Sequence, residues 1–269
     1  MNMQNKVVVI TGASTGIGYA CAEAFGMAGA SVVLAARSAE GLHKACLQLK
    51  QRNISCIAVP TDVSIEADCK NLISKAVEAY GKIDVLVNNA GISMRALFID
   101  VDLDVIKKLM DVNFWGTVYT TKHALPYLLK SKGSLIGISS VSGKKGVPAR
   151  SGYSASKFAM EGFLECIRTE NLHKGLHVLV VSPGFIATGI RQSSLTSDGT
   201  SQKDSPRNEA AMMTPETAAK AIVQATAQKK RDLVLTSQGK LLVFLDKFIP
   251  GFMDKIVYNH MAKEANSPL

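Results

Sequence analysis

The sequence predicts an α/β fold: a doubly wound, parallel, seven-stranded sheet followed by a C-terminal helical extension. Short apolar runs rich in Val, Ile and Leu recur seven times along the 269 residues. These runs mostly lack the alternation of a strand that has one face in water, so both faces are expected to be buried. Segments long enough for helices separate the runs, and this order favours right-handed crossovers within one parallel sheet.

The apolar runs are the expected strands. In chain order they cover residues 6–10, 31–36, 55–60, 84–87, 134–138, 177–181 and 232–235. The expected helices between them include 39–51, 66–80 and 214–229. In the last of these, Thr214 is suited to cap the helix and Pro215 to occupy its first turn.

The composition is that of a globular chain, with 47% apolar and 20% charged residues. No internal repeat or linker divides it, so we expect one α/β domain over residues 1–238 and an amphipathic extension over residues 239–269. No apolar run approaches the roughly 18 residues of a membrane helix, and the polar start is unlike a signal peptide. The five scattered cysteines are expected to be free thiols, which favours the cytoplasm.

The net charge of +9 arises from 31 basic and 22 acidic residues and is unevenly distributed. Residues 1–121 carry 11 charges of each sign, whereas residues 122–191 carry 10 basic and 3 acidic residues. A basic field can attract nucleic acid, an acidic membrane or a phosphate-rich ligand, and it can equally serve solubility. Because no nucleic-acid motif and no basic–aromatic interleaving accompany the charge, we expect no nucleic-acid binding.

A glycine-rich turn follows the first strand and opens a helical pattern. Glycines let the backbone approach a pyrophosphate, and the helix N-terminus supplies N–H groups and partial positive charge. The strand before the turn and the helix after it are the context that a dinucleotide site requires. The cofactor residues expected in this turn are Gly12, Ser14, Thr15, Gly16, Ile17 and Gly18.

The end of the second strand indicates which dinucleotide binds. An acidic residue there would accept a hydrogen bond from a ribose 2′-hydroxyl, and an arginine would accommodate a 2′-phosphate. The strand ends in Ala36-Arg37-Ser38, and Glu40 is the nearest following acid. The planar guanidinium of Arg37 suits a phosphate, although a solvated loop arginine has the same pattern. We therefore predict NADP as the cofactor.

Further motifs stand in order along the chain, after the first, third, fourth and sixth strands. The matching residues are Gly12, Gly16, Gly18, Asp62, Val63, Asn88, Asn89, Ala90, Gly91, Pro183, Gly184, Ile186 and Thr188. Over residues 5–238 the chain resembles the single-domain branch of the short-chain dehydrogenase/reductase family, which has a Rossmann fold. The resemblance implies that the pair after the third strand contacts the adenine. It also implies that the last four residues belong to a segment that covers the nicotinamide.

Tyr153 and Lys157 form the expected acid/base pair, because positions four apart share a helix face. A phenol has a pKa of about 10, too high for ready proton exchange near neutrality. A neighbouring cation favours the phenolate and lowers that pKa. Alone, such a pair is common on protein surfaces, but the accompanying motifs favour catalysis.

Two further residues complete the expected catalytic set. Ser140 lies at the carboxyl end of the fifth strand, where α/β sheets place ligands, and its hydroxyl can donate to a carbonyl oxygen. The resemblance identifies Ser140 rather than Ser139 as the catalytic serine. It also implies that Asn113 orders a water linking the lysine to solvent, whereas the alternative for Asn113 is a core amide that interrupts a helix.

Together these residues predict reduction of a carbonyl by NADPH, or the reverse oxidation. Tyr153 would protonate the developing alkoxide while Ser140 steadies the oxygen. Lys157 would lower the pKa of the tyrosine and, by resemblance, hold the nicotinamide ribose. No metal is expected, because the histidines lack ligand spacing; they are His43, His123, His173, His177 and His260.

Substrate information is sparse. Residues 190–213 are expected to form a substrate lid, with a loop over 193–205 that is polar and mobile. Lys144, Lys145 and Arg150 could ring the mouth of the site and attract an anion, or be solvated loop charges. We expect an apolar carbonyl substrate such as a steroid, a lipid or a xenobiotic.

The tail carries apolar residues on one side of residues 240–258 and lysines opposite, with Pro250-Gly251 expected to split it into two helices. Three interpretations remain open: packing on the domain or a dimer partner, a wall for a greasy substrate, and peripheral membrane contact. The resemblance implies a homodimer through helices near 104–130 and 153–173, and the tail disfavours a compact tetramer.

Two other functions are compatible with part of the sequence. One is an NADP-binding redox sensor without turnover, which the complete Ser, Tyr, Lys and Asn set disfavours. The other is a nucleotide-sugar epimerase or dehydratase, which would need a larger C-terminal substrate domain than this tail supplies.

Overall fold

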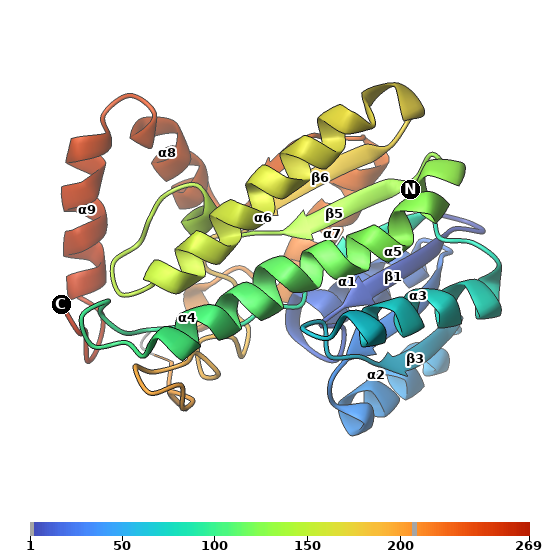
Figure 1. Cartoon of the computed structure of the whole chain (residues 1–269), viewed down its shortest axis with the longest axis horizontal. Coiled ribbons are helices and arrows are strands. Elements are labelled where there is room, and N and C mark those ends of the chain that lie inside the picture. The colour runs from blue at the N-terminus through green and yellow to red at the C-terminus, as the bar shows by residue number, and fades with distance from the viewer. Residues whose placement is uncertain (1–2, 206–208) are drawn as a thin grey trace.

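The computed structural model describes residues 3–205 and 209–269, which form the predicted doubly wound α/β fold (Figure 1). Seven parallel strands within these residues have the order β3-β2-β1-β4-β5-β6-β7. They are β1 Val7–Thr11, β2 Ser31–Ala36, β3 Cys56–Pro60, β4 Val85–Asn88, β5 Ser134–Ile138, β6 His177–Ser182 and β7 Asp232–Val234. The order reverses between β1 and β4, and such a switch point opens a crevice at the carboxyl ends of the strands.

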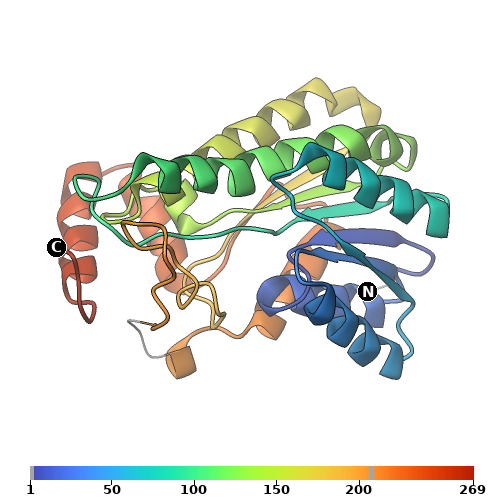
Figure 2. The same ribbon diagram turned by 60° about the horizontal axis from the view of Figure 1, so that its bottom comes forward.

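Helices cover both faces of the sheet (Figure 2). One layer holds α1 Gly16–Met27, α2 Ala39–Gln51 and α7 Pro215–Ala227. The opposite layer holds α3 Glu66–Tyr80, α5 Gly116–Lys130 and α6 Ser151–Glu170. The helix α4 Leu103–Leu109 runs through a π-helical segment, Met110–Trp115, directly into α5.

The two helical layers explain why the strands lack alternation. Successive side chains of a strand point to opposite faces. In β1, Val8 and Ile10 pack in the core of the first layer, and Val7 and Val9 pack in the core of the second. All of these residues are buried, so both faces of the strand must be apolar.

Asp84 fastens the amino ends of the two central strands. The predicted strand 84–87 begins one residue later, at Val85, and the Asp84 carboxylate accepts hydrogen bonds from the Val7 N–H at 2.9 Å and Lys6 Nζ at 3.0 Å. Lys82 Nζ lies 3.1 Å from the same carboxylate. Burial by itself would raise the pKa of Asp84, but these partners hold it below its ordinary value.

The extension forms two helices at one end of the molecule, α8 Ser237–Asp246 and α9 Pro250–Ala262 (Figures 1 and 2). Pro250 opens α9, which confirms the predicted split of the tail. Lys145 ties both helices to the domain, because its Nζ lies 2.7 Å from the Asp246 carboxylate and 2.5 Å from that of Asp254. Within residues 3–205 and 209–269, no helix combines the length and apolarity needed to cross a membrane.

Candidate active site

Three glycines with different structural roles shape the turn between β1 and α1. Gly12 and Gly16 have φ angles of 64° and 58°, a region that favours glycine. A Cβ on Gly12 would lie 2.9 Å from Ala90 Cα, so the turn approaches the chain after β4 closely. A Cβ on Gly18 would collide with the Gly12 carbonyl oxygen, which makes Gly18 a packing residue between the helix and the turn.

Asn89 and Thr11 lock this turn to the end of β4. The Asn89 amide donates to the carbonyl oxygens of Thr11 at 2.9 Å and Gly12 at 3.1 Å. The Thr11 hydroxyl accepts from the N–H groups of Asn89 and Ala90, each at 3.0 Å. The N-N-A-G motif therefore holds the glycine turn in place through the Asn89 side chain and two backbone N–H groups.

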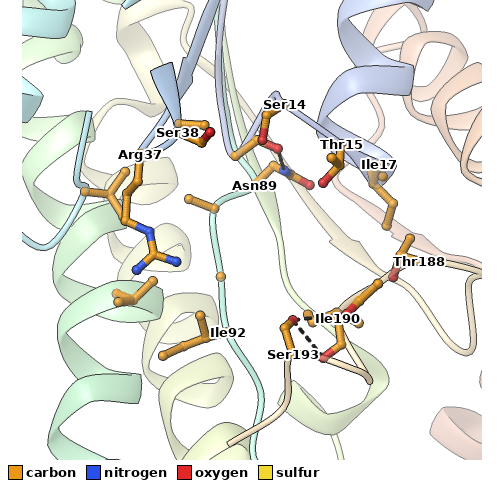
Figure 3. Close-up of a pocket in the computed structure, with 18 of the residues that line it drawn as sticks. Ser14, Thr15, Ile17, Arg37, Ser38, Asn89, Ile92, Thr188, Ile190 and Ser193 are labelled. Atoms are coloured by element: carbon orange, nitrogen blue, oxygen red, sulfur yellow. Dashed lines mark hydrogen bonds between the residues drawn. The ribbon is translucent and has the colours of Figure 1, made fainter. Parts of the chain in front are cut away.

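A cavity of about 770 Å³ lies at the carboxyl edge of the sheet, within the size range of ligand pockets. Figure 3 shows side chains from several elements around it, with Arg37 and Ser38 on one side and Thr188 on another. The predicted cofactor residues that line it are Gly12, Ser14, Thr15, Gly16, Ile17, Arg37, Asp62, Val63, Asn89, Ala90, Gly91 and Thr188. The close-set glycine turn, the helix N-terminus and this lining fit a dinucleotide.

Other predicted cofactor residues lie outside the lining of this cavity; they are Gly18, Tyr153, Lys157, Pro183, Gly184 and Ile186. Their positions show why. The Pro183 carbonyl accepts from the Val141 N–H at 2.9 Å, and a Cβ on Gly184 would press against Thr236. Ile186 is buried, and its carbonyl accepts from Arg191 at 2.7 Å. Residues 183–186 therefore pack against neighbouring segments of the protein and do not line the cavity.

Residues that were not predicted as cofactor contacts also line the cavity, two of them from the expected lid; they are Ala36, Ser38, Thr61, Ile92, Val112, Gly189, Ile190 and Ser193. Ala36, Ser38 and Thr61 stand at or just after the carboxyl ends of β2 and β3, so their place relative to the strands was a usable signal. Val112 has no such signal, because it lies in the π-helical segment.

The expected substrate lid contributes to two places. Ile190 and Ser193 reach the cofactor cavity, and Leu195 belongs to the apolar cluster around Tyr153. The lid is tied down, since the Leu195 N–H donates to the Ser93 carbonyl and the Leu195 carbonyl accepts from the Arg95 N–H, both at 2.8 Å. Residues 206–208 of the predicted lid lie outside the described residues.

Arg37 is exposed at the tip of β2, beside Asp62. Burial alone would raise the pKa of Asp62, but hydrogen bonds from Ser64 and the charge of Arg37 hold it below its ordinary value. Asp62 is thus an anion that accepts from the Ser64 N–H and hydroxyl, at 3.0 and 2.7 Å. The guanidinium of Arg37 stands at the cavity wall, where a phosphate could reach it.

The predicted catalytic residues converge at this edge of the sheet. Tyr153 and Lys157 lie one turn apart on α6 and are both buried, with Lys157 Nζ 5.9 Å from the Tyr153 ring centre. A side-chain hydrogen bond joins Tyr153 to Ser140, which follows β5. Burial raises the pKa of Tyr153, while this hydrogen bond and the charge of Arg150 oppose the rise. The sequence analysis predicts Lys157 as the cation that lowers this pKa, whereas the cation that opposes the rise in the structure is Arg150.

Asn113 occupies the π-helical segment, a kind of interruption that is frequent at functional sites. Its amide donates to the Ile92 carbonyl and to Ser156 Oγ, each at 2.9 Å, and its oxygen accepts from the Ile92 N–H at 2.8 Å. Because both amide hydrogens are engaged, Asn113 joins the chain after β4 to α6. That Asn113 orders a water stays a prediction. Such a water would have to donate its hydrogen bond to the side-chain oxygen or to the backbone carbonyl oxygen of Asn113.

Lys157 adjoins the cofactor cavity and a partly buried carboxylate. Its Nζ donates to the Ile138 carbonyl at 2.9 Å, and a Cβ on Gly91 would lie 3.3 Å from it. Burial lowers the pKa of Lys157 to about 8, and the charge of Glu161, one turn further along α6, opposes that fall. Glu161 itself accepts from Ser139 Oγ at 2.6 Å and Lys144 Nζ at 2.7 Å.

Replacing Glu161 with Gln is expected to lower the pKa of Lys157, because the negative charge that stabilises its ammonium is removed. A lysine is protonated below its pKa, so any step that needs the ammonium is lost as pH rises through that value. In the variant, the pH above which the predicted carbonyl reduction declines should fall by about one unit. The pH profile of kcat measures this, with Glu165→Gln on the exposed side of α6 as the control. An unmoved profile would contradict the coupling.

The three basic residues between Ser140 and Tyr153 are engaged within the protein. Lys144 pairs with Glu161, and Lys145 pairs with the two tail aspartates. Arg150 is buried and donates to Ser93 Oγ at 3.1 Å and the Met94 carbonyl at 3.4 Å. These contacts fix the segment between β5 and α6, an outcome that neither of the two sequence interpretations described.

Comparisons with known proteins agree with this geometry. The family model described as short chain dehydrogenase matches residues 6–198. Dehydrogenase/reductase SDR family member 7B from Bos taurus is 35% identical over 274 residues, covering 98% of this chain and 84% of that protein. A dehydrogenase/reductase SDR family protein 7-like from Drosophila melanogaster is 34% identical, covering 98% and 83%.

Two solved structures are similar in fold. An alcohol dehydrogenase from the archaeon Thermococcus sibiricus, complexed with 5-hydroxy-NADP, has a TM-score of 0.76 and 26% identity, with 86% of this chain and 95% of that chain covered. A short-chain dehydrogenase/reductase from Burkholderia phymatum in complex with NAD has a TM-score of 0.84 and 23% identity, with 94% and 96% covered. The family model and the relatives, taken with the site geometry, place this chain in the short-chain dehydrogenase/reductase family of oxidoreductases.

Proposed function

We propose that this protein is an NADP(H)-dependent oxidoreductase that interconverts a ketone and a secondary alcohol on an apolar substrate. The observation that carries the proposal is the buried Tyr153, joined to Ser140 by a hydrogen bond and followed one turn later by Lys157. Lys157 adjoins the wall of the dinucleotide-sized cavity through Gly91. A proton donor, an oxygen-binding hydroxyl and a cation thus lie together, with the cation next to the cavity wall.

The roles of the residues follow from these contacts. Bound NADPH would supply hydride to the carbonyl carbon. Tyr153 donates its proton to the oxygen as negative charge develops there, and Ser140 donates a hydrogen bond to the same oxygen. Lys157 places positive charge beside the phenol, which stabilises the phenolate left after proton transfer. Asn113 fixes Ile92 and Ser156 and so keeps α6 against the cofactor side of the site.

An apolar substrate is supported by the surroundings of Tyr153. The tyrosine belongs to a buried cluster with Met94, Val105, Leu109 and Leu195. Apolar walls with a few polar groups are typical of small-molecule sites. Nicotinamide absorbance, followed with NADPH and separately NADH against steroid, long-chain and small aromatic ketones, tests the proposal. Turnover with NADPH would support it, whereas cofactor binding without any turnover would favour a sensor.

Replacing Arg37 with Ser is expected to lower kcat/KM for NADPH by about tenfold to a hundredfold, because a charge-assisted hydrogen bond to the 2′-phosphate would be lost. With NADH, which lacks that phosphate, kcat/KM should change little. Initial rates with both cofactors measure the effect, and Arg52→Ser, at the exposed end of α2, is the control. An equal loss with both cofactors would assign Arg37 to the structure of the turn.

A homodimer is part of the proposal. Trp115 and Phe158 are half-exposed large apolar residues, and they stand on the surface that the π-helical segment and α6 present. Trp115 stacks on Tyr119, with ring centres 5.6 Å apart. Burial of such aromatics against a second copy would stabilise a dimer. Sedimentation velocity tests this, and a monomer at micromolar concentration would contradict it.

A further inference from the structure

The tail exposes a set of large apolar side chains that are not buried against the rest of the protein. Leu241, Phe244, Phe248, Phe252 and Ile256 are between 41% and 69% exposed. Leu241 and Phe244 lie on one side of α8, Phe248 follows in the turn after it, and Phe252 and Ile256 recur on one side of α9. These five residues, here called the outer face, flank the turn that joins the two helices at the far end of the molecule (Figure 1).

The opposite side of the tail is already packed on the domain. The buried side of α9 carries Met253, Val257 and Met261. The chain after α9 is held as well, because Arg95 donates to the Ala265 carbonyl at 2.8 Å and pairs with the buried Glu264 at 3.5 Å. The outer face is therefore not needed to attach the tail, and its exposed aromatics require another explanation.

Charge distinguishes the two sides of the tail. Both aspartates, Asp246 and Asp254, pair with Lys145 of the domain. At roughly 100° per residue, the outer face is bordered by Lys240 on α8, by Lys247 at the C-cap of that helix and by Lys255 on α9. All three lysines are exposed, and no ion pair engages them within residues 3–205 and 209–269. The outer face thus has an apolar centre with a positive rim.

We propose that the outer face docks on the surface of an anionic lipid bilayer. Aromatic and aliphatic side chains entering the headgroup region, with lysines beside them, are the pattern of interfacial helices. Each lysine near an anionic surface adds attraction. A second copy of this chain fits the face less well. A symmetric dimer through it would place the same patch against itself and bring the lysine rims together.

Flotation of the purified full chain with vesicles tests this proposal without substrate or turnover. Wild type should float with vesicles of phosphatidylserine mixed into phosphatidylcholine and much less with phosphatidylcholine alone. The double variant Phe244→Ser/Phe248→Ser should lose most of this binding. The triple variant Lys240→Glu/Lys247→Glu/Lys255→Glu should weaken it by about tenfold or more, and added salt should weaken wild type in the same direction.

Matched variants elsewhere on the surface act as controls. Met27→Ser/Leu172→Ser removes apolar residues that are 65% and 66% exposed, and Lys50→Glu/Lys70→Glu/Lys220→Glu reverses three exposed lysines. Both should bind vesicles like wild type. Absence of wild-type flotation, or an equal loss in these controls, would overturn the proposal. A change in sedimentation coefficient of the Phe variant with unchanged flotation would overturn it too, and would assign the face to self-association. Because cofactor-dependent turnover of a water-soluble ketone is measured without vesicles, failure here leaves the proposed reaction independently testable.

Discussion

Tyr153→Phe is expected to reduce the rate of carbonyl reduction by between about a hundredfold and ten-thousandfold, the range typical for loss of a general acid. The substitution removes only the hydroxyl that is hydrogen-bonded to Ser140 and leaves the buried ring in its apolar cluster. Packing around Met94 and Leu195 should therefore persist. The loss should lie in kcat, because the proton is transferred in the transition state.

Single-turnover rates and cofactor affinity together check this expectation. Cofactor affinity, followed by nicotinamide fluorescence, should stay close to that of wild type because the dinucleotide cavity is lined by other residues. Tyr80→Phe removes an exposed phenol hydroxyl that lies 3.3 Å from Ser55 Oγ, and it is a suitable control. A Tyr153→Phe enzyme with normal kcat would assign proton transfer to another group.

Lys157→Met is expected to lower kcat/KM by about a hundredfold or more. The substitution removes the ammonium beside the phenol and the contact that the family resemblance implies with the nicotinamide ribose. It also removes the hydrogen bond to the Ile138 carbonyl. Folding should survive, because methionine has a similar reach and removes a buried charge, while Glu161 keeps its pairing with Lys144.

The pH dependence separates an electrostatic role for Lys157 from simple packing. Since its pKa is lowered to about 8, the ammonium is present below that pH and is lost above it. Wild-type reduction should therefore decline as pH rises through about 8, and Lys157→Met should lack that decline. The pH profiles of kcat and kcat/KM measure both effects, with thermal unfolding as a check on folding. A decline that persists in Lys157→Met would assign it to another group.

Much of the fold was predictable because its determinants are local. Two-sided burial gives continuous apolar strands, and β5 was predicted at Ser134–Ile138 without error. β2 was predicted with the same accuracy, and the bounds of the other strands differed by one residue, as at Val85 and Val234, where hydrogen bonding rather than composition sets the boundary. The division of the tail followed from Pro250, whose fixed φ suits the first turn of a helix.

The site was predictable where one short segment carries the chemistry. Gly12 and Gly16 stand in one turn, and Tyr153 and Lys157 stand one helical turn apart, so spacing alone indicated their joint roles. The hydrogen bonds that Glu161 accepts from Ser139 and Lys144 were not predictable in this way. Those partners are 22 and 17 residues away, and only the packing of α6 against the end of β5 brings them together.

By itself, the sequence determined the order of strands and helices, the dinucleotide turn and the Tyr–Lys pair, because each depends on periodicity or spacing within a few residues. Only the tertiary structure decided which loop charges are neutralised, that Ile190 and Ser193 face the cofactor cavity, and which side of the tail stays exposed. These outcomes depend on where distant segments meet. Lys145 shows the reason most clearly, since the two aspartates that it binds lie about 100 residues further along the chain, and no local pattern encodes such a contact.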